Sequence, residues 1–474
     1  MNFEWSYFLD IGIISIALLL ATLIRSKIKF FQRFLIPNAL TAGLILLPFY
    51  NFVGPHLGLV QTGLGEIVYH LLSMSFIAMM LRKTESKRGK AGKGVLWFSI
   101  AVTFQLGAQG FIGFVLTLVL AATVVPGLFP SFGLLVPLGY ALGPGQAFAI
   151  GSGWEQFGFV GAGSVGLTFA AIGFLIASFV GVFLINYGVR HGWLGKHSDE
   201  IATIDTGPGV RRAGSEMPVG ARLTTDSDAI DSMTVNLGMV VAVYLLTFLF
   251  LKLISFGLSF AGDLGTDLAT NLWGIGFVFA SVMALVVRLI LRAAKADHIL
   301  DTGSLTRISG TSVDLTVAAA VGAISLVVVG QYWLPILVIA SIAGTFVIVA
   351  VPWMGSRLFT DHRLHRTLIL FGAMTGTLPT GLALLRVIDP DFKTPVGSDY
   401  VYSSAIVFLL VIPLILMINL PAYAVDRGQP GLIWITLGML VAYVVIGFVL
   451  FLIFSKGRGL KKVGRLWLPE EEEK

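Results

Sequence analysis

Cysteine is absent from this chain of 474 residues, and charged side chains are scarce. Without cysteine, neither disulfides nor thiolate metal sites can form. Charged residues make up 12% of the sequence, whereas soluble domains carry about 25%. The seven histidines are scattered without the spacing of metal ligands. No phosphate-binding loop or catalytic triad is recognisable, which argues against an ATP-driven pump and against an intramembrane hydrolase, so no enzyme activity is expected.

Apolar residues dominate what remains. They make up 56% of the chain, and its mean hydropathy is +0.88. Runs at 11–24, 111–125, 235–251 and 401–420 approach or reach the roughly 20 residues that a membrane span needs. The sequence therefore predicts an all-α polytopic membrane protein, surrounded by lipid. The net charge of +6 is typical of basic cytoplasmic loops and does not indicate nucleic-acid binding.

Lysine and arginine between the apolar runs predict the topology, because these residues concentrate in cytoplasmic loops. Basic residues follow the first run, and the strongest basic cluster lies at 82–93. We therefore expect the N-terminus outside and the C-terminus in the cytoplasm. The expected spans are 6–25, 34–53, 65–81, 95–124, 163–189, 234–256, 270–292, 311–329, 335–356, 401–424 and 431–454.

Two apolar segments do not fit this series as spans. Residues 131–160 and 367–398 must each begin and end on one side of the membrane to keep the charge pattern. Arms of about 12 residues rise about 18 Å, too little for a hydrocarbon core of about 30 Å. Gly and Pro interrupt both segments, at 143–146 and 375–381. We expect two re-entrant hairpins, the first entering from outside and the second from the cytoplasm.

Each half of the chain then holds five spans and one hairpin, in opposite orientation. The expected units are a first inverted repeat at 1–190, a cytoplasmic linker at 191–233, a second repeat at 234–425, and an extra helix with a cytoplasmic tail at 426–474. Inverted repeats with broken helices are typical of secondary transporters, whose binding sites lie where the broken helices meet.

The hairpin tips carry the candidate binding residues. Exposed carbonyl groups suit sodium, and the positive ends of helix dipoles suit a carboxylate. The alternative is that glycine and proline only kink or pack helices. The sequence predicts sodium contacts at Gly143, Gly376 and Pro379, and substrate contacts at Gly145, Gln146, Thr377 and Thr380.

Four further side chains are candidates. Arg386, in the second hairpin, could pair with a substrate carboxylate or reach the cytoplasmic interface. Asp314 could bind sodium or balance Arg386, and its alternative role is to cap a helix N-terminus. Gln109 could bind the ion or simply bond two helices. Thr345 precedes its hairpin tip by the same spacing as Gln109, so we expect it to mirror Gln109 in ion binding.

Several of these features together resemble the bacterial sodium/glutamate symporter family over about residues 5–424. They are the two interrupted hairpins, Gln109, the Ile-Pro-Asn-Ala-Leu-Thr-Ala-Gly stretch at 36–43, the small-residue span at 161–190 and Gly-Thr-Leu-Pro-Thr at 376–380. The resemblance implies a homodimer in the bacterial inner membrane that takes up glutamate, with sodium as the coupling ion and no other cofactor.

The first hairpin tip departs from that family. Its members usually carry Gly-Gly-His-Gly-Thr-Gly there, and this chain has Pro144 and Gln146 at the His and Thr positions. The resemblance therefore implies the fold and the coupling, and it leaves the substrate open.

Sodium-coupled symport of glutamate or a similar anionic amino acid or carboxylate, by alternating access, is the leading hypothesis. One alternative is a channel or facilitator whose pore forms between the two opposed hairpins. Another is a proton-coupled organic-anion carrier. A membrane sensor or scaffold without transport is a third, and the lack of a sizeable soluble domain in the sequence counts against it.

Overall fold

The computed structural model describes residues 5–82, 92–194, 219–225, 229–260, 262, 269, 272–273, 275–389 and 394–469. Every regular element in these ranges is helical, which confirms the predicted all-α class. Most of the expected linker, namely 195–218 and 226–228, lies outside the described residues.

Ten candidate spans, long and apolar enough to cross a membrane, are found within the described ranges. They correspond to ten of the eleven predicted spans and confirm a multi-pass membrane protein. The helices are α1 (Ser6–Lys27), α3 (Asn38–Pro48, continued by η1, Phe49–Val53, and η2, Gly54–Leu57), α4 (Gln61–Leu81), α5 (Lys93–Thr123), α8 (Ala162–Arg190), α9 (Ser232–Ser259), α11 (Gly276–Ala293), α14 (Trp333–Leu358), α17 and α18 together (Val396–Met417, Leu420–Asp426) and α19 (Gly431–Phe454).

The remaining elements are shorter or more polar. They are α2 (Lys29–Arg33), η3 (Phe132–Leu134), α6 (Leu135–Pro137), η4 (Leu138–Leu142), α7 (Pro144–Glu155), η6 (Asp297–Ile299), α12 (Thr302–Gly322), α13 (Leu326–Gln331), α15 (Arg363–Thr375) and α16 (Leu378–Ile388).

Helix α12 differs from the predicted span at 311–329. It begins at Thr302, where the Asp301 carboxylate accepts a hydrogen bond from the Ser304 backbone N–H at 2.7 Å. Such a side-chain cap satisfies a donor that has no partner inside the helix. Asp314 therefore lies well inside the helix, and the alternative that it caps the N-terminus is wrong. The polar residues of the first three turns explain why hydropathy alone placed the start too late.

The two interrupted segments form broken helix pairs. In the first, η3, α6 and η4 run up to Gly143, and α7 begins at Pro144. Gly143 has φ +103°, a conformation that glycine adopts without a Cβ penalty. Proline suits the first helical position because its missing N–H would have no partner there. In the second pair, α15 ends at Thr375 and α16 starts at Leu378.

Close glycine contacts pack each broken pair, either arm against arm or against a neighbouring helix. A Cβ atom placed on Gly372 of α15 would lie 2.7 Å from the Gly381 Cα of α16. Likewise, a Cβ on Gly166 of α8 would lie 2.6 Å from the Ala147 carbonyl oxygen of α7. Any larger residue would push these helices apart. Small residues at helix contacts let membrane helices gain van der Waals packing that lipid cannot replace.

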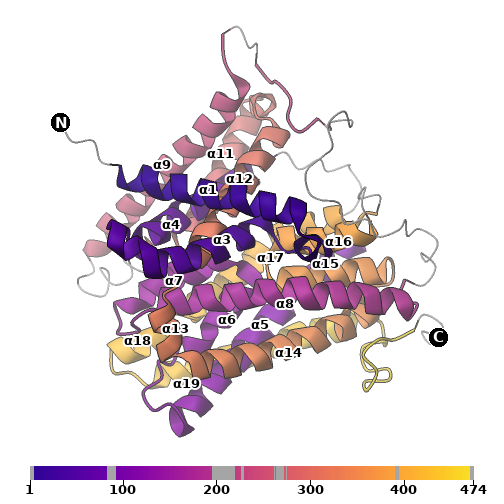
Figure 1. Ribbon diagram of the computed structural model, residues 1–474. Helices are drawn as coiled ribbons and strands as arrows, with labels where there is room; N and C mark the ends of the chain where they lie inside the picture. The colour runs from indigo at the N-terminus through magenta and orange to yellow at the C-terminus, as the bar shows by residue number, and fades with distance from the viewer. Residues whose placement is uncertain are drawn as a thin grey trace.

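The buried side chains form three clusters, which fall into two groups of helices. The first group joins α1, α3, α4 and α12, together with α9 and α11. The second and larger group joins α5, both broken pairs, α14, α17 and α19, and Leu72 of α4 and Phe277 of α11 also pack into it. Helix α8 contributes to both. In Figure 1, α9 and α11 lie at one end of the molecule, α14 and α19 lie at the other, and α8 runs between them.

The segment after α19 is fixed to the second group. The Arg357 side chain, fully buried in α14, donates hydrogen bonds to the carbonyl oxygens of Lys462 and Arg465 at 2.9 and 3.0 Å. Trp467 stacks on Trp193 at the end of α8, with ring centroids 4.3 Å apart. The C-terminal segment therefore ties α8 to the end of α14, next to the first arm of the second broken pair.

Candidate ligand-binding cavity

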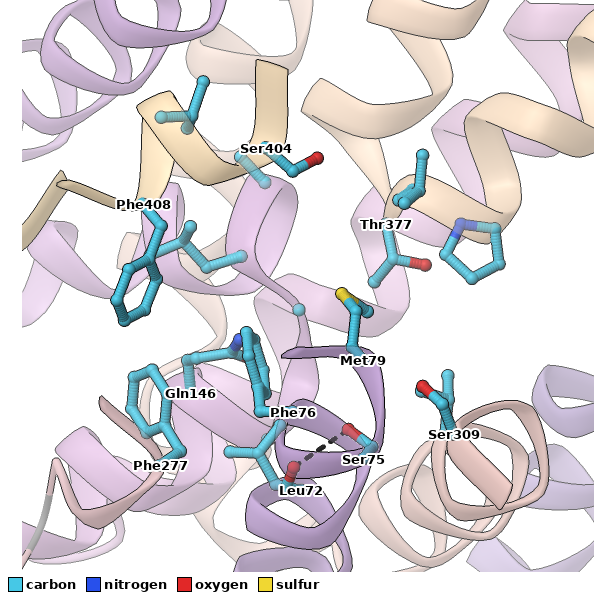
Figure 2. A pocket seen from close by; sticks show the side chains of 18 of the residues that line it. Leu72, Ser75, Phe76, Met79, Gln146, Phe277, Ser309, Thr377, Ser404 and Phe408 are labelled. Carbon is cyan, nitrogen blue, oxygen red and sulfur yellow. Dashed lines mark hydrogen bonds between the residues drawn. The ribbon is translucent and has the colours of Figure 1, made fainter. Parts of the chain in front are cut away.

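A cavity of about 340 Å³ lies between the two groups of helices, where both helix breaks reach it. Its walls come from α4, α11 and α12 on one side and from α5, α17 and the two broken pairs on the other. Figure 2 shows this space, with Met79 of α4 between Thr377 and Ser309, and Phe277 beside Phe408 across from them. Cavities of this size between helices commonly hold small molecules.

The first break supplies one end of the cavity. Gly143, Gly145 and Gln146 all line it, and their contacts with ion and substrate stay predictions. The Gly143 N–H donates to the Leu138 carbonyl oxygen at 2.8 Å, which closes the last turn before the break. A Cβ on Gly145 would lie 2.7 Å from a Leu72 methyl carbon, so glycine here allows α4 to approach the tip.

The second break reaches the same place. Thr377 and Pro379 line the cavity, while Gly376 and Thr380 are buried behind them. The Thr377 and Thr380 hydroxyl oxygens are 3.4 Å apart, within hydrogen-bonding distance. A Cβ on Gly143 would lie 2.9 Å from the Thr377 methyl carbon. The two breaks, distant in sequence, are thus in contact in the fold.

Gln109 lies beside this meeting point. It is fully buried in α5, and its side-chain amide N–H donates to the Met374 carbonyl oxygen of α15 at 3.2 Å. Its amide oxygen has no hydrogen-bond partner among the described residues. Gln105, one turn earlier, is also fully buried, with neither amide atom bonded within the described ranges. Unpartnered buried amide groups are costly unless a ligand or water completes them.

Three predicted site residues lie elsewhere. Asp314, Thr345 and Arg386 are exposed on their helices and do not line the cavity. On α12 the cavity side carries Val313, and the next residue of a helix points about 100° away. The fold therefore does not bring these three side chains together with the tips, and their roles in binding stay predictions.

Most residues that form the walls of the cavity were not predicted from the sequence. On α4 these are Leu72, Ser75, Phe76, Met79 and Arg82; on α12, Thr306, Ser309, Gly310, Val313, Thr316 and Val317; and on α17, Tyr400, Ser403, Ser404, Val407, Phe408, Val411 and Ile415. The hydroxyl residues of α12 recur at intervals of three and seven, which places them on one helical face. That spacing was a usable signal. The α4 and α17 faces carry no comparable mark in an apolar sequence.

No family model, curated protein or solved structure matches this chain. Among the residues that the structure describes, no group of three or more His, Asp or Glu side chains gathers as a metal site. What the chain binds must therefore be argued from the cavity itself.

Proposed function

We propose that the chain is a secondary active transporter that couples sodium entry to the uptake of glutamate or a similar anionic amino acid or carboxylate. One observation carries this proposal. Two broken helices from opposite halves of the chain touch at a single cavity, through Gly143 and Thr377. Paired helix breaks at a common site are the hallmark of transporters built from inverted repeats.

In this proposal the two broken pairs are re-entrant hairpins, and the halves 1–190 and 234–425 are inverted repeats. The short arms favour this arrangement, because the 12 residues of α7 and the 11 of α16 span less than about 20 Å. In this proposal the Arg82 end of the cavity faces the cytoplasm and the N-terminus lies outside, because basic residues concentrate in cytoplasmic loops. The proposed setting is a bacterial inner membrane, with the chain as a homodimer.

The residues near the second break fit a sodium ion. The unpartnered Gln109 amide oxygen lies beside the last turn of α15, and the backbone at Gly143 and Gly376 is interrupted close by. Hard cations prefer amide and carbonyl oxygens of this kind. Bound there, sodium would supply positive charge beside an anionic substrate. Gln109, Gly143 and Gly376 would hold it.

In this proposal, alternating access would use the two groups of helices. Because the cavity lies between them, a movement of one group against the other could open it to either side in turn. The group containing both breaks would carry the ion and substrate, and the group of α1, α3, α4 and α12 would be the scaffold. Contacts between the groups at α8 would then change during the cycle.

Uptake into proteoliposomes tests the proposal. An inward sodium gradient is expected to drive accumulation of radiolabelled glutamate or a labelled monocarboxylate above the external concentration. Potassium in place of sodium should remove the accumulation, and empty liposomes are the control. Equal accumulation under a proton gradient without sodium would contradict sodium coupling. Flux that only equilibrates the label would favour a channel or facilitator.

A further inference from the structure

The charges lining the cavity restrict what it can bind. Glutamate carries two carboxylates and one ammonium group at neutral pH. Among the described lining residues Arg82 is the single charged side chain, and neither Asp nor Glu is present. A buried charge without a partner is costly. The side chains of the described lining therefore complement one negative charge by themselves and offer no acidic partner for an ammonium group.

Arg82 is available to bind an anion. It follows the last residue of α4, where a helix C-terminus favours a cation. Its guanidinium donates two long hydrogen bonds, to the Met79 carbonyl and the Thr306 hydroxyl, both at 3.4 Å. In the described part of the chain no carboxylate pairs with it. A guanidinium has five N–H donors, enough for a bidentate carboxylate in addition.

Beyond Arg82, the described lining carries uncharged hydroxyl and amide side chains, such as Thr377 and Gln146, among a majority of apolar ones. From Arg82 the α4 face continues through Met79 and Phe76 to Leu72, ten residues away or about 15 Å along the helix. Phe277 of α11 and Phe408 of α17 face this stretch from other walls, as Figure 2 shows. Aromatic walls stabilise a ligand by burying hydrocarbon surface, at about 25 cal/mol per Å². A second charged group on the ligand would be placed against hydrocarbon here.

We infer that the substrate of this cavity is a monocarboxylate with an apolar body about the size of an aromatic ring. Arg82 binds the carboxylate, and Phe76, Phe277 and Phe408 enclose the body. This inference rests on the proposed function, since it names the substrate class of the same cavity. It departs from glutamate because the described lining carries a single cation.

Equilibrium binding to the purified full-length protein, measured in sodium buffer by calorimetry, tests the inference. The probes are 3-phenylpropionate, its uncharged analogue 3-phenylpropan-1-ol, and glutamate. We expect 3-phenylpropionate to bind at least about tenfold more tightly than either other probe, because one lost charge pair or one unpaired charge costs at least that factor. Tighter binding of glutamate, or no binding of 3-phenylpropionate, would overturn the inference.

Matched variants identify Arg82 as the anion partner. Arg82→Gln should weaken 3-phenylpropionate binding at least about tenfold and leave the alcohol within about twofold, while Arg82→Lys restores part of the affinity. Arg307→Gln is the control, since Arg307 adjoins Thr306 on α12, is exposed and does not line the cavity. An Arg82→Gln protein that still prefers the acid over the alcohol would refute the role of Arg82. If Arg82→Gln does not fold, the ranking of the three probes on the unmodified protein decides.

The test separates this inference from the proposed function. Binding of 3-phenylpropionate without sodium-driven uptake in proteoliposomes would leave the substrate class standing and remove the transport proposal. Sodium-driven uptake of glutamate, with no binding of the monocarboxylate, would leave the transport proposal standing and remove the proposed substrate class.

Discussion

Two residues near the helix breaks, Gly143 and Gln109, are the most sensitive to substitution. At Gly143 a Cβ atom would not fit, and at Gln109 the side-chain amide joins two helices. Gly143 combines a left-handed φ of +103° with direct contact to the Thr377 side chain. Either feature alone excludes most residues, and together they require glycine. Gln109 holds α5 against the end of α15 through one amide donor and leaves its amide oxygen unpaired among the described residues.

Replacing Gln109 tests whether its amide oxygen binds sodium. Gln109→Leu keeps the volume and removes the proposed sodium ligand, so the sodium concentration for half-maximal uptake should rise about tenfold, equivalent to about 1.4 kcal/mol. Uptake as a function of sodium concentration in proteoliposomes measures it. Gln429→Leu, a change at an exposed glutamine between α18 and α19, is the control. An unchanged sodium requirement in Gln109→Leu would leave Gln109 as a bond between helices.

At the scale of elements, α12 joins two of the buried clusters. It packs chiefly against α4 and α3, and Gly322 lies where a Cβ would meet Leu46 at 2.8 Å. Its N-terminus depends on Asp301, whose carboxylate accepts hydrogen bonds from the Ser304 and Arg222 backbone N–H groups. Burial tends to raise the Asp301 pKa, but these hydrogen bonds together with the Ser304 hydroxyl outweigh it and lower the pKa below its usual range.

A lowered pKa in the folded state makes stability depend on pH. Asp301 stabilises the fold above its unfolded pKa, and this contribution is lost as the pH falls below about 4. Thermal unfolding in detergent from pH 7 to pH 3 should therefore show a smaller acid-induced loss in Asp301→Asn, which keeps an acceptor oxygen but cannot titrate. Asp301→Ala should lower stability at pH 7 by about 1 kcal/mol through loss of the cap.

The control for this measurement is Asp426→Asn at the end of α18, where the carboxylate is exposed. Its unfolding temperature should equal that of the unmodified protein at every pH. Identical acid profiles for the unmodified protein and Asp301→Asn would show that the cap does not depend on the carboxylate charge.

Movement of the whole molecule can be followed by thiol labelling. Because the chain has no cysteine, a maleimide reacts only with a thiol that is introduced by substitution. Ser404→Cys places one thiol on the α17 wall of the cavity, and Ser178→Cys places a control thiol in α8, fully buried and away from the cavity lining. A membrane-impermeant maleimide applied to inside-out vesicles should label position 404 and leave position 178 unlabelled.

If the two groups of helices move, sodium with a bound monocarboxylate should slow this labelling by roughly threefold or more, because the population shifts to states closed on the cytoplasmic side. Potassium with the same ligand is the reference condition. Labelling at position 404 that is fast from both sides of the membrane at once would contradict alternating access and favour a continuous pore.

Much of the architecture was readable in the sequence, and the reason is physical. A bilayer requires long apolar helices, so ten of the predicted spans could be located from hydropathy. The helix breaks at Gly143 and Gly376 were equally visible, since glycine and proline interrupt helices by their backbone properties. The start of α12 was misplaced because its first turns are polar, and a cap at Asp301 determines the start instead.

The sequence by itself determined the helical class, the membrane setting and the two breaks, because each depends on local composition. Only the tertiary structure decided that the breaks touch, that Gln109 lies beside them, and that Asp314, Thr345 and Arg386 lie away from the cavity. It also decided that Arg82, whose charge in the sequence indicates only topology, is the single cation among the described residues of the lining. These facts depend on which helical faces pack together, and in a uniformly apolar chain local pattern does not specify the faces.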